Sequence, residues 1–121
     1  MTQQDALAWF DIQVQDFEAA QRFYSAVINA DLTPAPDMPG TAFFPFGEGK
    51  VGGSLTHNAN VIPGNKTVTV HLTISDDIES ALLRVVNAGG TVTTPSTPIP
   101  EGYIASFEDL EGNTVGMFAT K

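Results

Sequence analysis

The 121-residue sequence contains no cysteine, which excludes disulfides, thiolate metal sites and cysteine nucleophiles. It is also poor in basic residues: five Lys and Arg residues stand against 14 Asp and Glu residues, and the formal net charge is −9. Such a chain lacks the positive patch that binds phosphate backbones, so we expect no nucleic acid partner. An acidic surface instead suits a neutral or cationic small molecule.

Long apolar runs are missing as well. No stretch approaches the roughly 20 apolar residues that a membrane span needs, so we expect no membrane partner. The N-terminus, Met-Thr-Gln-Gln-Asp, lacks the basic and then apolar pattern of a signal peptide, and we expect a cytoplasmic protein. Hydrophobic residues make up 42% of the chain, which is enough to build the core of a single domain over residues 1–121.

An internal repeat appears when the sequence is shifted by about sixty residues. Residues 9–16 then align with residues 69–76, and in both segments apolar residues alternate with other residues. This period of two is typical of a half-buried strand. Further along, residues 49–53 resemble residues 112–116, and each segment sits at a turn before a closing strand. The sequence therefore predicts two copies of a unit that contains one strand, one helix and three more strands.

Each copy contains a predicted helix after its first strand. Asp16 is the expected N-cap of the first helix, which should end around Asn29. Asp76 or Asp77 caps the second helix, and Gly89-Gly90 ends it. The predicted apolar stripes are Phe17, Ala20, Tyr24 and Val27 in the first helix and Ile78, Ala81, Leu82 and Val85 in the second.

These elements predict an α+β fold built from tandem βαβββ units. We expect the first unit over about residues 5–57, a linker over 58–66 and the second unit over 67–121. The units should form a curved, mainly antiparallel sheet with both helices on one face. The opposite, concave face would carry the residues that lie between the apolar positions of each first strand.

Several motifs resemble those of one family in the same order along the chain. The pattern Trp9–Val14, Asp16–Ala20 and Phe23-Tyr24 resembles the opening of glyoxalase-like and bleomycin-resistance-like proteins. The segment Phe107–Gly116 looks like the family's Asp-Pro-Glu-Gly-Asn closing turn, with Leu110 where proline is usual. The chain is thus identified as a member of the vicinal oxygen chelate superfamily, which also includes extradiol dioxygenases. The resemblance implies a ligand cavity and a homodimer.

Metal-dependent members resemble one another in placing His, Glu or Gln at four strand positions. Carried onto this chain, these positions fall on Trp9, Thr69, Gly116 and either Gly52 or Gly53. Such side chains are not a ligand set for a divalent ion. We therefore expect no cofactor and disfavour a divalent metal, which argues against glyoxalase I and extradiol dioxygenase chemistry. A displaced metal site made by His57, His71 and Asp11 is a further alternative.

Asp11 and His71 are the candidate catalytic residues, because they lie two places beyond the lost metal positions on the same strand faces. A carboxylate and an imidazole there could act as a polar anchor or an acid–base pair, or could only stabilise the cavity wall. Trp9 is either an aromatic platform for a flat or cationic ligand or a plug in the space of the metal. The candidate ligand-binding residues are Trp9, Asp11, Ser54, Thr69, His71, Tyr103 and Phe118.

Three functions are compatible with these residues. The leading hypothesis is a metal-independent small-molecule-binding protein that resembles bleomycin-resistance proteins and holds its ligand on the concave sheet face. The alternative is a glyoxalase-like lyase or isomerase, related to lactoylglutathione lyase, that uses a displaced metal or the Asp11 and His71 pair. The third is an accessory subunit without a ligand. Whether the chain is an enzyme stays open at this point.

Overall fold

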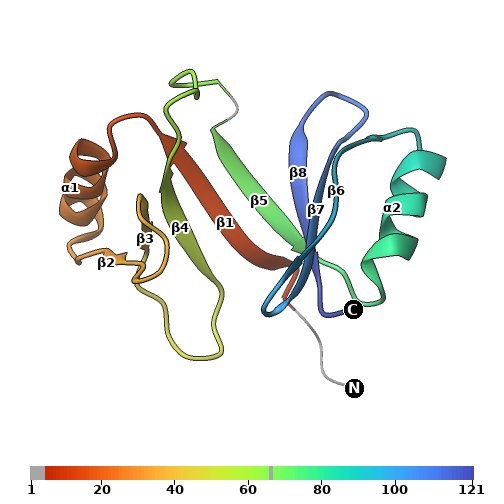
Figure 1. Ribbon diagram of the computed structural model, residues 1–121, viewed down its shortest axis with the longest axis horizontal. Helices are drawn as coiled ribbons and strands as arrows, with labels where there is room; N and C mark the ends of the chain where they lie inside the picture. Colours follow the sequence, from red (N-terminus) through yellow and green to blue (C-terminus); the bar gives the residue numbers. More distant parts are fainter. Residues whose placement is uncertain (1–4, 66) are drawn as a thin grey trace. The chain divides into compact units, whose positions relative to one another are not determined.

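A computed structural model describes residues 5–65 and 67–121, which form two compact units (Figure 1). The N-terminal unit is Trp9–Val68, and the C-terminal unit combines the residues up to Ala8 with Thr69–Lys121. The predicted linker over 58–66 thus belongs to the N-terminal unit in this division, although Lys66 lies outside the described residues. The signal-peptide prediction rests on residues 1–4, which also lie outside them.

The N-terminal unit has the predicted order of one strand, one helix and three strands. Its elements are β1 (Leu7–Val14), α1 (Phe17–Ile28), β2 (Thr33–Pro34), β3 (Thr41–Phe43) and β4 (Gly52–His57). The strands lie in the order β2-β3-β4-β1, in which β1 and β4 are parallel and the other neighbours antiparallel. Helix α1 packs against one face of this sheet through a core that includes Leu32, Ala42 and Leu55.

Both ends of α1 agree with the sequence prediction. The side chain of Asp16 accepts a hydrogen bond from the backbone N–H of Ala19, and Asn29 ends the helix in the left-handed conformation with φ of 56°. The predicted apolar stripe is correct as far as Tyr24, which packs on the core. It is wrong for Val27, which is 64% exposed, because the core contacts of α1 end before its last turn.

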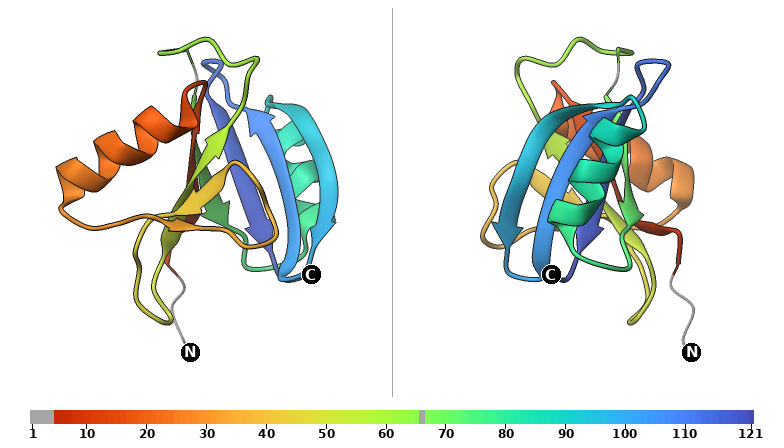
Figure 2. Two further views of the ribbon diagram at one scale, coloured as in Figure 1. Left: turned by 60° about the vertical axis from the view of Figure 1, so that its left-hand side comes forward. Right: turned by 90° about the vertical axis from the view of Figure 1, so that its right-hand side faces the viewer.

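The C-terminal unit repeats this arrangement. Its elements are β5 (Val68–Thr73), α2 (Ile78–Asn87), β6 (Thr91–Ile99), β7 (Gly102–Glu108) and β8 (Thr114–Ala119). The strands lie in the order β5-β8-β7-β6, with β5 and β8 parallel and the other neighbours antiparallel. Figure 2 shows α2 against one face of these strands, where Ile78, Ala81 and Leu82 pack on Ala105 and Met117.

Of the two candidate caps, Asp77 is the N-cap of α2. Its carboxylate accepts hydrogen bonds from the backbone N–H and the hydroxyl of Ser80, which lower the pKa of Asp77 below its ordinary value. Asp76 instead receives two hydrogen bonds from the guanidinium of Arg84, and this contact lowers the pKa of Asp76. Asp77 therefore caps the start of α2, while Asp76 binds Arg84 in its last turn.

These observations confirm the predicted α+β class and the two βαβββ units. Within each unit, two of the three strand pairings are antiparallel, and the helix covers one face of the sheet. In the described part of the chain, neither helix is long and apolar enough to span a membrane.

Candidate functional site

Polar side chains of β1 and β4 meet on the face of the N-terminal sheet that α1 does not cover. Ile12 and Leu55 point toward α1 and its core, so their strand neighbours project from the opposite face. The parallel register places Asp11 beside Ser54. It also places Trp9 beside Gly52 on the same strand pair. The open face is therefore polar at its centre and aromatic at one end.

A directed chain of hydrogen bonds connects these side chains. The indole Nε1 of Trp9 donates to the hydroxyl Oγ of Ser54 over 3.2 Å, and that hydroxyl donates to Oδ1 of Asp11 over 2.8 Å. Thr56 Oγ1 donates to the same carboxylate oxygen over 2.8 Å. An indole N–H can only donate and an ionised carboxylate can only accept, so the direction of the chain is fixed. Ser54 is 6% exposed, and its buried hydroxyl holds the indole ring in one orientation.

Two phenyl rings stand nearly perpendicular to the indole of Trp9. The ring centre of Phe43 lies 5.9 Å away at an angle of 82°, and that of Phe46 lies 5.6 Å away at 89°. Phe46 is 49% exposed, so solvent reaches this end of the site. We call the set of Trp9, Asp11, Phe43, Phe46, Ser54 and Thr56 the Trp9 cluster.

The dense aromatic run at residues 43–46 divides between the two sheet faces, as the alternation of side chains predicts. Phe43 contacts Trp9 on the open face. Phe44 contacts Phe10 and Tyr24 at ring-centre distances of 5.2 and 5.6 Å, and it packs on the α1 core. Phe44 thus packs on the α1 core, whereas Phe43 and Phe46 belong to the Trp9 cluster.

The family's metal positions do not carry metal ligands in this structure. Trp9, Gly52, Gly53 and Gly116 offer no side-chain atom that coordinates a divalent ion, and Thr69 offers a single hydroxyl. The ring of Phe46 fills the space into which a side chain at Gly52 would project, and the imidazole of His71 does the same at Gly116. Within residues 5–65 and 67–121, no group of three or more His, Asp or Glu residues could hold a metal ion. These residues do not fit a divalent metal.

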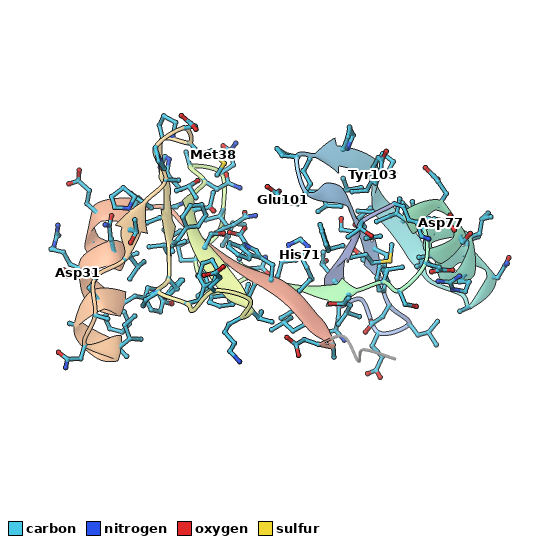
Figure 3. All side chains as sticks on the ribbon, turned by 90° about the horizontal axis from the view of Figure 1, so that it is seen from below. Asp31, Met38, His71, Asp77, Glu101 and Tyr103 are labelled. Carbon is cyan, nitrogen blue, oxygen red and sulfur yellow. The ribbon has the colours of Figure 1, made fainter. Side chains whose placement is uncertain are left out.

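The strand register also places the predicted residues of the C-terminal unit. His71 of β5 lies beside Gly116 of β8, so His71 rather than Thr69 is the sheet neighbour of that family position. His71 and Phe118 share the sheet face opposite α2. Tyr103 pairs with Ala119, which belongs to the α2 core, so Tyr103 points toward the other face. Figure 3 labels His71 and Tyr103 in this unit.

The predicted site residues therefore fall into two groups. Trp9, Asp11 and Ser54 come together in the N-terminal unit, whereas the other four candidates belong to the C-terminal unit. Asp11 and His71 lie in different units, and their cooperation stays a prediction. The sequence candidates did not include Thr56, although its place two residues after Ser54 puts both hydroxyls on one strand face.

Comparison with protein families gives one match. The family model described as the Glyoxalase/Bleomycin resistance protein/Dioxygenase superfamily matches residues 6–117, which is almost the whole chain. A comparison with curated proteins found no match.

Solved structures share the fold at low sequence identity. An NAD-dependent benzaldehyde dehydrogenase structure from Legionella pneumophila is 13% identical with a TM-score of 0.65, covering 93% of this chain and 98% of that one. A Mn(II)-bound glyoxalase from Novosphingobium aromaticivorans is 21% identical with a TM-score of 0.65, covering 95% of this chain and 38% of that one. Streptomyces coelicolor methylmalonyl-CoA epimerase, in complex with 2-nitronate-propionyl-CoA, is 13% identical with a TM-score of 0.63, covering 95% and 94%. At these identities the likeness concerns the fold alone.

Proposed function

The chain belongs to the glyoxalase/bleomycin resistance protein/dioxygenase superfamily, and we propose that it is a metal-independent small-molecule-binding protein of this group. The observation that carries the proposal is the hydrogen-bond chain from Trp9 through Ser54 to Asp11, which fixes an aromatic ring beside a carboxylate on the sheet face that α1 does not cover. Fold membership alone does not define the ligand, so the argument rests on these side chains.

The Trp9 cluster combines the two features that small-molecule sites commonly have. Aromatic side chains supply apolar contact area, and a few fixed polar groups orient the ligand. Because Ser54 already holds the indole ring, binding does not have to order it, and less conformational entropy is lost on association. Asp11 is fixed in the same way by two hydroxyl donors. The site is therefore preorganised.

The donor chemistry of the family positions supports the metal-independent part of the proposal. Gly52 and Gly116 supply no ligand atom, and side-chain rings lie over both glycines. A divalent ion needs several nitrogen or oxygen donors, and His71 supplies only one imidazole. The aromatic ring of Phe46 instead adds to the wall of the proposed ligand site.

An intrinsic optical probe tests the proposal, because Trp9 is the only tryptophan of the chain. A thermal-shift screen with cationic, anionic, neutral and flat aromatic compounds identifies ligands, and each hit is then titrated against Trp9 fluorescence. We expect hits that raise Tm, change Trp9 emission and bind less tightly to Asp11→Asn. Tyr103→Phe, on the α2 face of the other unit, is the matched control. A screen without hits, or hits unaffected by substitution of Asp11, would overturn the proposal.

A glyoxalase-like lyase or isomerase with Asp11 and His71 as the acid–base pair is the alternative. It is favoured by one observation: among the described residues, Oδ2 of Asp11 accepts no hydrogen bond, so this oxygen is available to a reacting proton. Turnover that is lost in both Asp11→Asn and His71→Ala, with unchanged far-UV circular dichroism, would establish this function. Turnover retained in either variant would contradict it.

We also propose that the protein is a homodimer, and a cytoplasmic location stays a prediction from the sequence. The outward side of α1 exposes large apolar side chains, with Phe23 61% and Val27 64% exposed. Exposed apolar surface of this kind often marks a protein contact. Analytical ultracentrifugation tests the proposal, and a monomer at micromolar concentration would contradict it.

A further inference from the structure

We propose that the Trp9 cluster selects an organic cation, specifically a compact quaternary ammonium group. This inference rests on the proposed function and adds the chemical class of the ligand. It depends on three observations among the described residues of the N-terminal unit: the angles between the aromatic rings, a carboxylate oxygen that accepts no hydrogen bond from these residues, and the absence of a cationic partner for Asp11 among them.

The aromatic geometry is that of a corner lined by rings. Phe43 and Phe46 stand at 82° and 89° to the indole of Trp9, with ring centres less than 6 Å from it. A cation within about 6 Å of a ring centre is attracted by the negative face of the ring, and tryptophan gives the strongest attraction. Rings set at right angles allow one compact cation to approach more than one ring, which is how quaternary ammonium groups are recognised.

The carboxylate supplies the second contact. Oδ1 of Asp11 is occupied by the hydroxyls of Ser54 and Thr56, whereas Oδ2 accepts no hydrogen bond among the described residues. One hydroxyl separates Asp11 from the indole N–H of Trp9, so the negative charge lies next to the aromatic corner. A ligand cation over the indole therefore also gains Coulomb attraction from Asp11.

No side-chain cation neutralises this carboxylate in the described part of the chain. The salt bridge found there joins Arg84 to Asp76 in the C-terminal unit. A half-buried carboxylate without a counter-ion favours a ligand that brings a positive charge. The net charge of −9 adds a long-range field that attracts cations and repels anions.

The test compares choline with 3,3-dimethyl-1-butanol, in which a carbon atom replaces the charged nitrogen at nearly the same shape. Each compound is titrated against Trp9 fluorescence, and Tm is followed in parallel. We expect choline to bind about tenfold more tightly than the neutral compound, because only choline gains the cation–ring and carboxylate contacts. Asp11→Asn should remove most of this difference.

Two further variants keep the test decisive. Asp31→Asn removes the same charge on the α1 side of the unit (Figure 3) and should change the choline affinity less than twofold. If Asp11→Asn does not fold, Phe46→Leu replaces it; this half-exposed ring should contribute severalfold to choline binding and little to binding of the neutral compound.

The outcomes separate the two proposals. Equal affinity for both compounds, or an equal loss in Asp31→Asn and Asp11→Asn, would overturn the cation proposal. If neither compound changes Trp9 emission while other hits of the screen do, the ligand class is wrong and the binding function stands. If no compound of any charge affects Trp9, both proposals fail.

Discussion

Ser54→Ala is the sharpest test of how the Trp9 cluster is built. The substitution removes the hydroxyl that accepts from the indole of Trp9 and donates to the carboxylate of Asp11. A neutral hydrogen bond contributes about 1 kcal/mol net, and one to a charged group about 1.5–3 kcal/mol. Water can partly replace the lost partners, because Trp9 and Asp11 are only half-buried. We therefore expect the free energy of unfolding to fall by about 2 kcal/mol.

Urea unfolding followed by circular dichroism measures this change. For a domain of this size, a loss of about 2 kcal/mol corresponds to a fall in Tm of roughly 6–10 °C. Emission of the single tryptophan reports the second consequence, because the indole ring is no longer held by Ser54. The emission of Ser54→Ala should shift to longer wavelength in the native state.

Thr56→Val is the matched control for this prediction. It removes a hydroxyl of the same strand face that donates to Asp11 but does not contact Trp9. We expect a smaller loss of stability, about 1 kcal/mol, and unchanged Trp9 emission. A Ser54→Ala protein within about 0.5 kcal/mol of the parent, or equal emission shifts in the two variants, would refute the reasoning.

Three further predictions follow from the same structure. Gly53→Ala should lower the free energy of unfolding in urea by about 1–3 kcal/mol, because the new methyl group meets the half-buried ring of Phe10, which packs against Phe44. Gly52→Ala should cost less, since the ring over Gly52 is half-exposed and can move. The ionised carboxylate of Asp109 should stabilise the folded state at pH values above its ordinary pKa of 3.8. This contribution to the free energy of unfolding should be lost as the pH falls through the lowered pKa of Asp109. The Asn113 side chain and nearby backbone N–H groups cause that lowering, and Asp109→Asn should flatten the acid limb of Tm measured from pH 2 to 6. Added Mn²⁺ or Zn²⁺ should leave Tm unchanged, and a saturable rise would contradict the loss of the metal site.

The elements of the fold could be predicted because local signals agree with one another. Strict alternation identified β1 and β5, and the side-chain acceptors Asp16 and Asp77 begin the two helices where the sequence placed them. The prediction for Val27 was wrong because helical periodicity identifies the apolar face of a helix without showing how far the sheet extends beneath that face. That extent depends on strand lengths and loop paths, which local patterns do not encode.

The site was only partly predictable for a related reason. Alternation along β1 placed Asp11 on the open face, but the hydrogen bond to Ser54 joins residues 43 positions apart and depends on the register of β1 against β4. A shift of one residue would have turned Ser54 toward α1. Tyr103 shows the same dependence, because its face is set by the pairing of β7 with β8 and not by its own neighbours.

Gly52 and Gly116, at two of the positions that the resemblance implies for metal ligands, each lie beneath a side-chain ring. A side chain at Gly52 would collide with the ring of Phe46, and one at Gly116 would collide with the imidazole of His71. Each ring takes its present place because the glycine beneath it lacks a Cβ atom. In the N-terminal unit the ring of Phe46 also packs against Trp9, so the aromatic corner depends on the absence of a side chain at residue 52. A carboxylate side chain at this position would require Phe46 to move, and that movement would disrupt the proposed cation site.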